Sequence, residues 1–149
     1  MSDTNSIVVC FAVAYSLLFR KDVMKKRIIH HLEYPSDVDK ELIPLLDVLN
    51  SIPGVRTRYS CCGHGNDEFY LLLAVSCERA ARMVIEKFEK FGFFVDYNGI
   101  RWENPYMAPY ECDLRVGSWE VGRKKARERK SFILKIRSSI EELVPRNGW

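Results

Sequence analysis

A run of seven apolar residues constrains the fold of this chain more than any other feature. Residues 69–75 read Phe-Tyr-Leu-Leu-Leu-Ala-Val and follow the turn-forming residues Asn66 and Asp67. A half-solvated strand alternates apolar and polar residues, whereas an unbroken run of this length is typical of a strand inside a sheet. We therefore expect 69–75 to be a central strand, with the other apolar segments arranged around it.

Helical and strand patterns mix along the rest of the chain without regular alternation. Apolar spacing predicts helices over residues 24–32, 36–49, 77–91 and 124–143. Further strands are predicted over residues 55–60, 93–97, 100–102 and 110–116, with a hairpin turn at Asn98-Gly99. Pro44 removes a backbone hydrogen bond inside the second helix, so we expect a kink or a late start there. This order predicts an α+β fold, a compact single domain with a mixed or antiparallel sheet flanked by helices.

The chain length fits one domain. With 149 residues, the chain can bury a sizeable core without staples. We expect residues 19–149 to form this domain and residues 1–18 to be an apolar extension packed on it. The apolar run at 7–19 has 13 residues, fewer than the roughly 20 that a membrane helix needs. No basic segment precedes it, so we expect neither a signal peptide nor a membrane partner.

Composition and cysteine content point to a cytoplasmic protein. The chain is 47% hydrophobic and 29% charged, with a net charge of +3, values that fit a globular protein and do not by themselves require an anionic partner. Its five cysteines are odd in number, which favours a reduced, cytoplasmic setting over a disulfide framework. The sequence does not indicate an oligomeric state.

Two segments concentrate the positive charge. Residues 20–27 hold five basic residues in eight, and residues 123–130, the basic segment, hold six in eight. Such runs are often solvated helix faces. Clustered Lys and Arg also bind polyanions, and on that interpretation the phosphate-binding candidates are Lys25, Lys26, Lys124 and Lys125. Aromatic residues that would then stack on a base are Trp102, Tyr106 and Tyr110.

The densest chemistry lies in residues 57–64, the octet, which reads Thr-Arg-Tyr-Ser-Cys-Cys-Gly-His and is followed by Gly65. Metal binding is one interpretation. Cys61, Cys62 and His64 stand too close together for the usual zinc half-site of two spaced cysteines. We therefore expect no metal, although Cys77 or Cys112 would be the partners that complete a structural zinc site.

Thiol catalysis is a second interpretation. A reactive cysteine needs a nearby cation or histidine to lower its pKa, and His64, Arg56 and Arg58 lie close to Cys61 and Cys62 in sequence. Alternation along a strand would instead bury one cysteine and expose its neighbour. We favour this structural arrangement over a nucleophile.

A ligand-binding loop is the third interpretation. Gly63 and Gly65 permit positive φ angles and close backbone approach. Their amides, together with Ser60 and His64, would cradle an anion or a nucleotide. The position between two strands suits such a site, because binding residues concentrate on loops held by rigid elements.

Several motifs share their order with a known family. The segments are Ser36–Asp39, Leu42–Leu46, Leu49-Asn50 and Thr57–His64. They resemble the wybutosine-synthesising protein 3 family, which carries an Asp before a helix ending in Leu/Ile-Asn and then Thr-x-Ser-Ser-Cys-Ser-Gly-Arg. Residues 92–100 are similar to that family's Gly-Phe-Arg-x-Ser-Gly-Ile stretch, and residues 111–116 to the strand that follows it. The resemblance spans about residues 19–143.

The resemblance implies a compact α+β fold and S-adenosylmethionine-dependent methylation of a tricyclic base in tRNA. The residues that match the family motif are Thr57, Ser60, Cys61 and Gly63. His64 stands where the family has arginine, Tyr59 where it has serine, and Cys62 where it has a second serine. The candidate catalytic residues are accordingly Ser60, Cys61 and His64. The candidate substrate- or cofactor-binding residues are Thr57, Arg58, Cys62, Gly63 and Gly65.

Two other functions stay open. A non-catalytic module would use the same loop to bind a small nucleotide or a partner protein, and the absence of the family arginine, a permanent cation, favours it. A zinc-stabilised structural protein is the other. The string from Ser60 to Gly65 is also similar to one in short bacterial and phage proteins, and this likeness implies no activity.

Overall fold

The computed structural model describes residues 27–98 and 112–146. Residues 29–144 form one compact unit. The other unit comprises residues 1–28 and 145–149, and its described part contains an antiparallel bridge between Arg27 and Arg146. Several predictions fall outside the described residues: the extension at 1–18, Lys25, Lys26, the strand at 100–102, and the aromatic residues Trp102, Tyr106 and Tyr110.

In its described residues, the 29–144 unit is an α+β fold on a four-stranded antiparallel sheet. Its elements are η1 (Lys40–Leu42), α2 (Ile43–Asn50), β1 (Val55–Cys61), β2 (Phe69–Val75), α3 (Glu78–Lys90), β3 (Phe94–Asn98), β4 (Cys112–Ser118), α4 (Trp119–Gly122) and α5 (Ala126–Glu141). The strands lie in the order β1-β2-β4-β3. The predicted fold class is therefore confirmed, with the sheet antiparallel.

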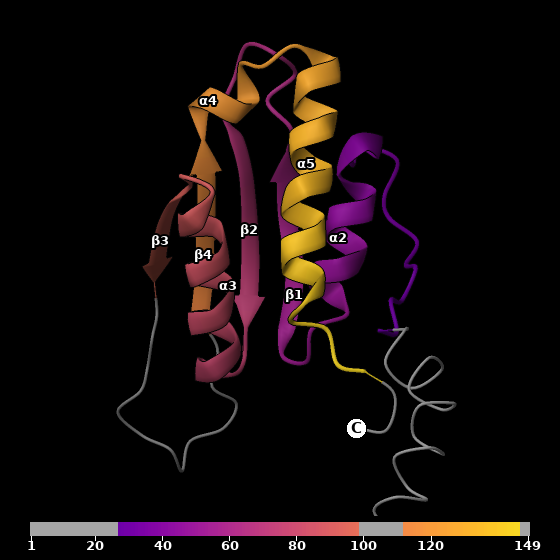
Figure 1. Ribbon diagram of the computed structural model, residues 1–149, viewed down its shortest axis with the longest axis vertical. Coiled ribbons are helices and arrows are strands. Elements are labelled where there is room, and N and C mark those ends of the chain that lie inside the picture. The colour runs from indigo at the N-terminus through magenta and orange to yellow at the C-terminus, as the bar shows by residue number, and fades with distance from the viewer. Residues whose placement is uncertain (1–26, 99–111, 147–149) are drawn as a thin grey trace, which may run out of the picture. The chain divides into compact units, whose positions relative to one another are not determined.

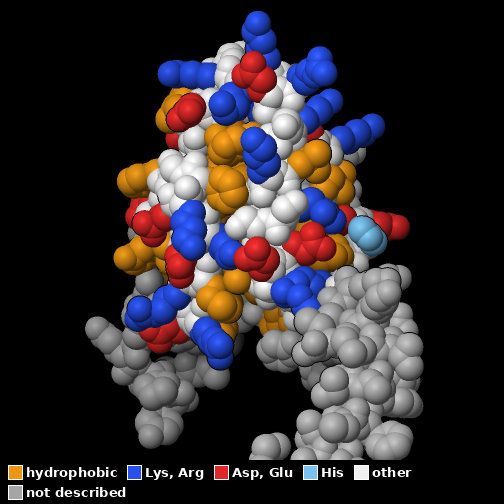
Figure 2. All heavy atoms as spheres, viewed as in Figure 1, with side chains coloured by type: hydrophobic (Ala, Val, Ile, Leu, Met, Phe, Trp, Pro, Cys, Tyr) orange, Lys and Arg blue, Asp and Glu red, His pale blue; other side chains and the backbone are white. Residues whose placement is uncertain are grey.

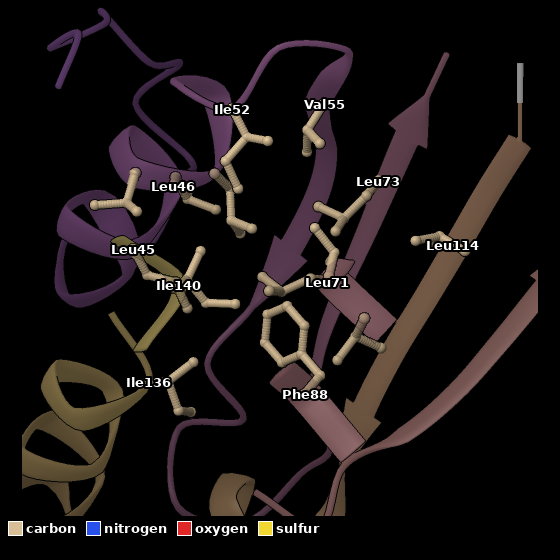
Figure 3. Packing of buried hydrophobic residues seen from close by; sticks show 14 of the residues in the cluster. Leu45, Leu46, Ile52, Val55, Leu71, Leu73, Phe88, Leu114, Ile136 and Ile140 are labelled. Atoms are coloured by element: carbon tan, nitrogen blue, oxygen red, sulfur yellow. The ribbon is translucent and has the colours of Figure 1, made fainter. Parts of the chain in front are cut away.

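The apolar run forms β2, which pairs with β1 on one side and β4 on the other. Helices α2, α3 and α5 cover one face of the sheet (Figure 1). The β2 side chains that point to them are 0% exposed: Phe69, Leu71, Leu73 and Val75. Burying each such side chain contributes roughly 1.5–3 kcal/mol. Figure 3 shows two of them, Leu71 and Leu73, in one cluster with side chains such as Leu45, Phe88 and Ile136 from the three helices.

The helix predicted from residue 36 begins later. Residues 36–38 form a turn, η1 follows, and α2 begins at Ile43 with Pro44 in its first turn. A first-turn amide has no partner within the helix, so proline costs nothing there. The alternative of a late start at Pro44 is thus confirmed.

The helix predicted over residues 24–32 is absent from its described part, because residues 28–32 are not helical. The backbone amides of His30 and Leu32 donate instead to Ser51 Oγ at 2.8 Å and Asp47 Oδ1 at 3.2 Å. A side chain within α2 and the side chain of its C-cap residue therefore accept backbone hydrogen bonds from this segment. Among the described residues, no helix is long and apolar enough to cross a bilayer.

Among the described strands, β1 lies at the edge of the sheet and pairs with β2 alone. The register of the pair shifts between Thr57 and Tyr59, so Arg58 is the extra residue of a β-bulge. The residues on either side of the bulge have different surroundings. Thr57 forms hydrogen bonds with Asn50 at the end of α2, whereas Tyr59 is 67% exposed. β1 thereby presents polar residues where it leads into the loop to β2.

Candidate functional site

The octet divides between the end of β1 and the connection to β2, residues 62–68, which we name the octet loop. Three consecutive residues of this loop have left-handed backbone angles: Gly63 (φ 88°), His64 (φ 53°) and Gly65 (φ 89°). The two glycines adopt this conformation without cost, whereas a residue with a Cβ adopts it at a cost of about 1 kcal/mol. His64 is thus held in an unusual conformation by the loop around it.

The octet loop packs tightly against α4. A Cβ on Gly63 would lie 2.4 Å from Gly122 Cα, and the Gly65 amide donates to the Gly122 carbonyl at 2.8 Å. The Gly63 amide points to Cys61 Sγ at 3.4 Å. Both glycine amides therefore have partners within the protein, so they are not available as the anion donors that the sequence predicted.

Asp39 joins the octet from the segment before η1. Its Oδ2 accepts a hydrogen bond from the Cys62 amide at 2.9 Å, and its Oδ1 lies 3.4 Å from His64 Nε2. Potential metal-ligating atoms of Asp39, Cys61 and His64 all lie within 4.8 Å of one another. Asp39 is not among the predicted site residues, because it lies in the helix predicted over residues 36–49 and no sequence spacing links it to the octet. The Cys-x-x-His spacing of Cys61 and His64 is the part of the sequence that indicates a metal-ligating cluster here.

The two adjacent cysteines have different surroundings. Cys62 is 2% exposed, and Cys61 is partly buried. One cysteine is buried as predicted, but its neighbour is not fully exposed, and Cys62 follows the end of β1. Burial, and next a hydrogen bond with Glu41, raises the pKa of the Cys62 thiol to about 12. A thiol with this pKa is protonated at neutral pH and is a poor nucleophile.

Glu41 links Cys62 to a buried arginine of the basic segment. Arg129 Nε donates to Glu41 Oε1 at 2.6 Å, and another Arg129 nitrogen donates to the Lys124 carbonyl at 2.9 Å. The side chains of Arg129 and Glu41 are 8% and 9% exposed. One of the six basic residues is therefore structural, which the charge pattern alone did not reveal.

The rest of the basic segment lies beside the octet loop. A Cβ on Gly65 would be 3.7 Å from the Lys124 carbonyl and 3.7 Å from Arg129. Figure 2 shows Lys and Arg side chains gathered at the end of the molecule where α4 meets α5, at the top of the view. The predicted phosphate-binding residues Lys124 and Lys125 thus lie at the same end as the octet loop.

A pocket of about 360 Å³ lies along β1. Its walls include four of the octet residues, Thr57, Arg58, Tyr59 and Ser60, together with residues 32–35, 37 and 38 and two residues of α2. Asn50 fixes Thr57 in place: the Thr57 amide donates to Asn50 Oδ1 at 2.8 Å, and Asn50 Nδ2 donates to Thr57 Oγ1 at 2.9 Å. Thr57, Arg58 and Ser60 therefore share one pocket, as candidate ligand-binding residues should.

Leu32 and Tyr34 of the pocket wall are held in place by the buried carboxylate of Asp47, which is not among the residues predicted from the sequence. Asp47 is 5% exposed. It accepts hydrogen bonds from Tyr34 Oη at 2.7 Å and the Leu32 amide at 3.2 Å, and lies 3.0 Å from His31 Nδ1. Burial, and next the hydrogen bond to Asp47, raises the pKa of Tyr34 to about 12, so its hydroxyl stays protonated.

The predicted site residues of the octet thus lie along β1 and in the octet loop. Thr57, Arg58 and Ser60 line the pocket, and Cys61, Cys62 and His64 follow directly. Cys77 and Cys112 do not join them: Cys112 pairs with Val75 at the far end of β2, and Cys77 caps α3 just beyond it. Comparisons of the chain with protein-family models, curated proteins and solved structures find no match.

Proposed function

We propose that this protein binds RNA or a nucleotide at the surface formed by the pocket, the octet loop and the basic segment. The observation that carries the proposal is the 2.8 Å hydrogen bond between the Gly65 amide and the Gly122 carbonyl. It holds the octet loop beside a segment in which Arg123, Lys125 and Arg127 are exposed. Exposed cations next to a ligand-sized pocket are the arrangement that phosphates and bases require.

The pocket supplies chemistry for a base or a nucleoside. Tyr59 lines it and is 67% exposed, so its ring is accessible for stacking, which contributes roughly 1–3 kcal/mol per base. Arg56 and Arg58 add positive charge to the same wall. Arg58 Nη1 lies 3.9 Å from Asp113 Oδ1, a weak contact that a phosphate oxygen would replace with a stronger one.

The family resemblance extends the proposal to methylation of tRNA with S-adenosylmethionine. The pocket volume of about 360 Å³ is within the usual range for small-ligand sites. Glu33 and Asp37 line the pocket and suit the sulfonium and ammonium charges of this cofactor. In this form of the proposal Ser60, Cys61 and His64 face the reacting groups, and the protein acts in the cytoplasm.

A pair of matched arginine substitutions tests RNA binding. Arg127 and Arg79 are both exposed second residues of helices, α5 and α3. α3 begins at the end of the unit opposite the octet loop, because the Ser76 amide, two residues before α3, donates to the carbonyl of Gly54 just before β1. We expect Arg127→Glu to weaken binding of single-stranded RNA or tRNA and to reduce the slope of log K against log salt by about 0.7. Arg79→Glu should leave both unchanged in fluorescence anisotropy titrations.

Equal affinities for the two variants, or a wild-type affinity independent of salt, would contradict RNA binding through the basic segment. A parallel calorimetric titration with S-adenosylmethionine separates the enzyme from a non-catalytic module. Binding that Thr57→Ala weakens supports the methyltransferase form. No heat at millimolar cofactor, with RNA binding intact, leaves the non-catalytic RNA- or nucleotide-binding module.

A further inference from the structure

Asp39, Cys61 and His64 bring three kinds of metal-ligating atom together at the surface of the unit. A carboxylate oxygen, a thiol sulfur and an imidazole nitrogen lie within 4.8 Å of one another. They come from two segments, the residue before η1 and the end of β1 together with the octet loop that follows it. The Cys62 amide, which donates to Asp39 Oδ2 at 2.9 Å, joins the two segments, so the cluster depends on the fold and not on one stretch of sequence.

The spacing within the cluster fits ligands of one ion. Ligands at tetrahedral zinc lie about 2.0–2.3 Å from the metal, which places them about 3.3–3.6 Å from one another. His64 Nε2 and Asp39 Oδ1 are 3.4 Å apart, longer than a normal hydrogen bond and equal to this ligand separation. Cys61 is partly exposed, so its side chain has room to complete the approach.

Each of the three side chains also has the supporting contact that a metal ligand needs. Asp39 uses Oδ2 for the Cys62 amide and leaves Oδ1 for an ion. The Gly63 amide points to Cys61 Sγ at 3.4 Å, a contact that orients the thiol. His64 Nδ1 meets Cys62 Sγ at 3.5 Å, which directs Nε2 toward Asp39. Outer contacts of this kind fix ligand orientation in metalloproteins.

The backbone conformation of the octet loop also directs His64 toward the other two residues of the cluster. His64 has φ 53° between two glycines that also have positive φ angles. A histidine in this conformation costs the fold about 1 kcal/mol. The reversal turns the imidazole back toward Asp39 and Cys61, and binding of an ion would offset this cost.

The ligand types select the metal. Magnesium and calcium take oxygen ligands, whereas a thiolate and an imidazole suit zinc. A carboxylate and a thiolate together balance the charge of a divalent ion. The side chain of His64 is 61% exposed, so a fourth position is open to solvent. Three protein ligands with an open fourth position are typical of catalytic zinc sites, not structural ones.

We propose that Asp39, Cys61 and His64 bind one Zn²⁺ ion whose fourth position is open to water or a ligand. The site lies next to the pocket, because Val38 and Ser60 line that pocket and precede two of the ligands directly. The proposal does not depend on RNA binding. It also differs from a structural zinc held by Cys77 or Cys112, which lie at the other end of the sheet.

The test uses the full chain without a histidine tag, stripped of metal with a chelator. We expect one zinc per chain by elemental analysis after dialysis. Cobalt, used as a spectroscopic probe, should give intense tetrahedral visible bands and a thiolate-to-cobalt charge-transfer band. Cys61→Ser should abolish the charge-transfer band and weaken zinc at least about 100-fold, while Cys77→Ser, which removes an exposed thiol, should change neither.

Two further variants keep the test independent of folding. Asp39→Asn retains an acceptor for the Cys62 amide, and His64→Asn places a residue that tolerates positive φ angles. Both should bind zinc at least about tenfold more weakly with unchanged circular dichroism. Substoichiometric zinc in the wild type, or a Cys61→Ser variant that keeps the charge-transfer band, would overturn the proposal.

Discussion

Arg129 and Glu41 form an ion pair whose side chains are 8% and 9% exposed. Removing both charges from water costs free energy. The attraction between the two side chains offsets this cost only when their remaining hydrogen-bonding groups also have partners. Arg129 has such a partner, because it also donates to the Lys124 carbonyl at 2.9 Å. Burial by itself would raise the pKa of Glu41, but the hydrogen bonds from Arg129 and Cys62, together with the charge of Arg129, outweigh burial and lower the pKa.

Loss of one partner should therefore be severe. We expect Arg129→Met to lower the free energy of unfolding by about 3–5 kcal/mol at pH 7, because Glu41 is left buried and unpaired. The lowered pKa of Glu41 means that the pair stabilises the wild type above the unfolded pKa of glutamate and that this contribution is lost as the pH falls through the folded pKa. The difference between wild type and variant should thus narrow in acid.

Urea unfolding at pH 7 and at acidic pH measures both effects. Arg82→Met is the matched control, because Arg82 pairs with Glu78 one helical turn away and its side chain is 77% exposed. Exposed pairs of this kind contribute about 0.5 kcal/mol or less. An Arg129→Met variant as stable as the Arg82→Met variant would show that the buried pair has no such role.

At the scale of elements, the octet loop and α4 approach each other closely because glycine at the contact has no side chain. A Cβ on Gly122 would lie 1.9 Å from the Asp67 carbonyl oxygen and 2.5 Å from the Phe69 amide. These are backbone atoms, so the clash cannot be relieved by rotating a side chain. The same contact positions the octet loop, which connects the packing of α4 to the candidate site.

We expect Gly122→Ala to destabilise the fold by at least about 3 kcal/mol, at the upper end of the range for overpacking. Gly92→Ala is the matched control: Gly92 has φ 81°, and an added Cβ would meet nothing within 4 Å. Its cost is the left-handed conformation alone, about 1 kcal/mol. Thermal unfolding of both variants gives the comparison. Equal shifts in Tm would mean that the backbone at the contact between the octet loop and α4 can move to accommodate a Cβ at little cost.

At the scale of the whole molecule, local signals predicted the sheet but not the assembly of the site. The apolar run of β2 and the late start at Pro44 follow from interactions within a few residues. Asp39 meets His64 from 25 positions away in sequence, and Glu41 meets Arg129 from 88 positions away. No periodicity records such pairs, because they depend on how α2, β1 and α5 pack. The octet could therefore be recognised, while its acidic partner could not.

Alkylation of the described cysteines can show whether the 29–144 unit unfolds in one cooperative step. Cys62 and Cys112 are 2% and 0% exposed and lie at opposite ends of the sheet, whereas Cys77 is exposed. Burial raises the pKa of both buried thiols, to about 12 for Cys62. Alkylation needs an accessible thiolate, so we expect rapid labelling of Cys77 and none of Cys62 or Cys112 in native buffer, even at pH 9.

Labelling with iodoacetamide at increasing urea, read peptide by peptide by mass spectrometry, follows the opening of each end. If the unit unfolds cooperatively, Cys62 and Cys112 become reactive with the same midpoint, because each is freed only by loss of the common core. Earlier labelling of Cys62 would instead show that the octet loop opens by itself. That result would separate the stability of the site from that of the sheet, and native-state labelling of Cys62 as fast as Cys77 would contradict its burial.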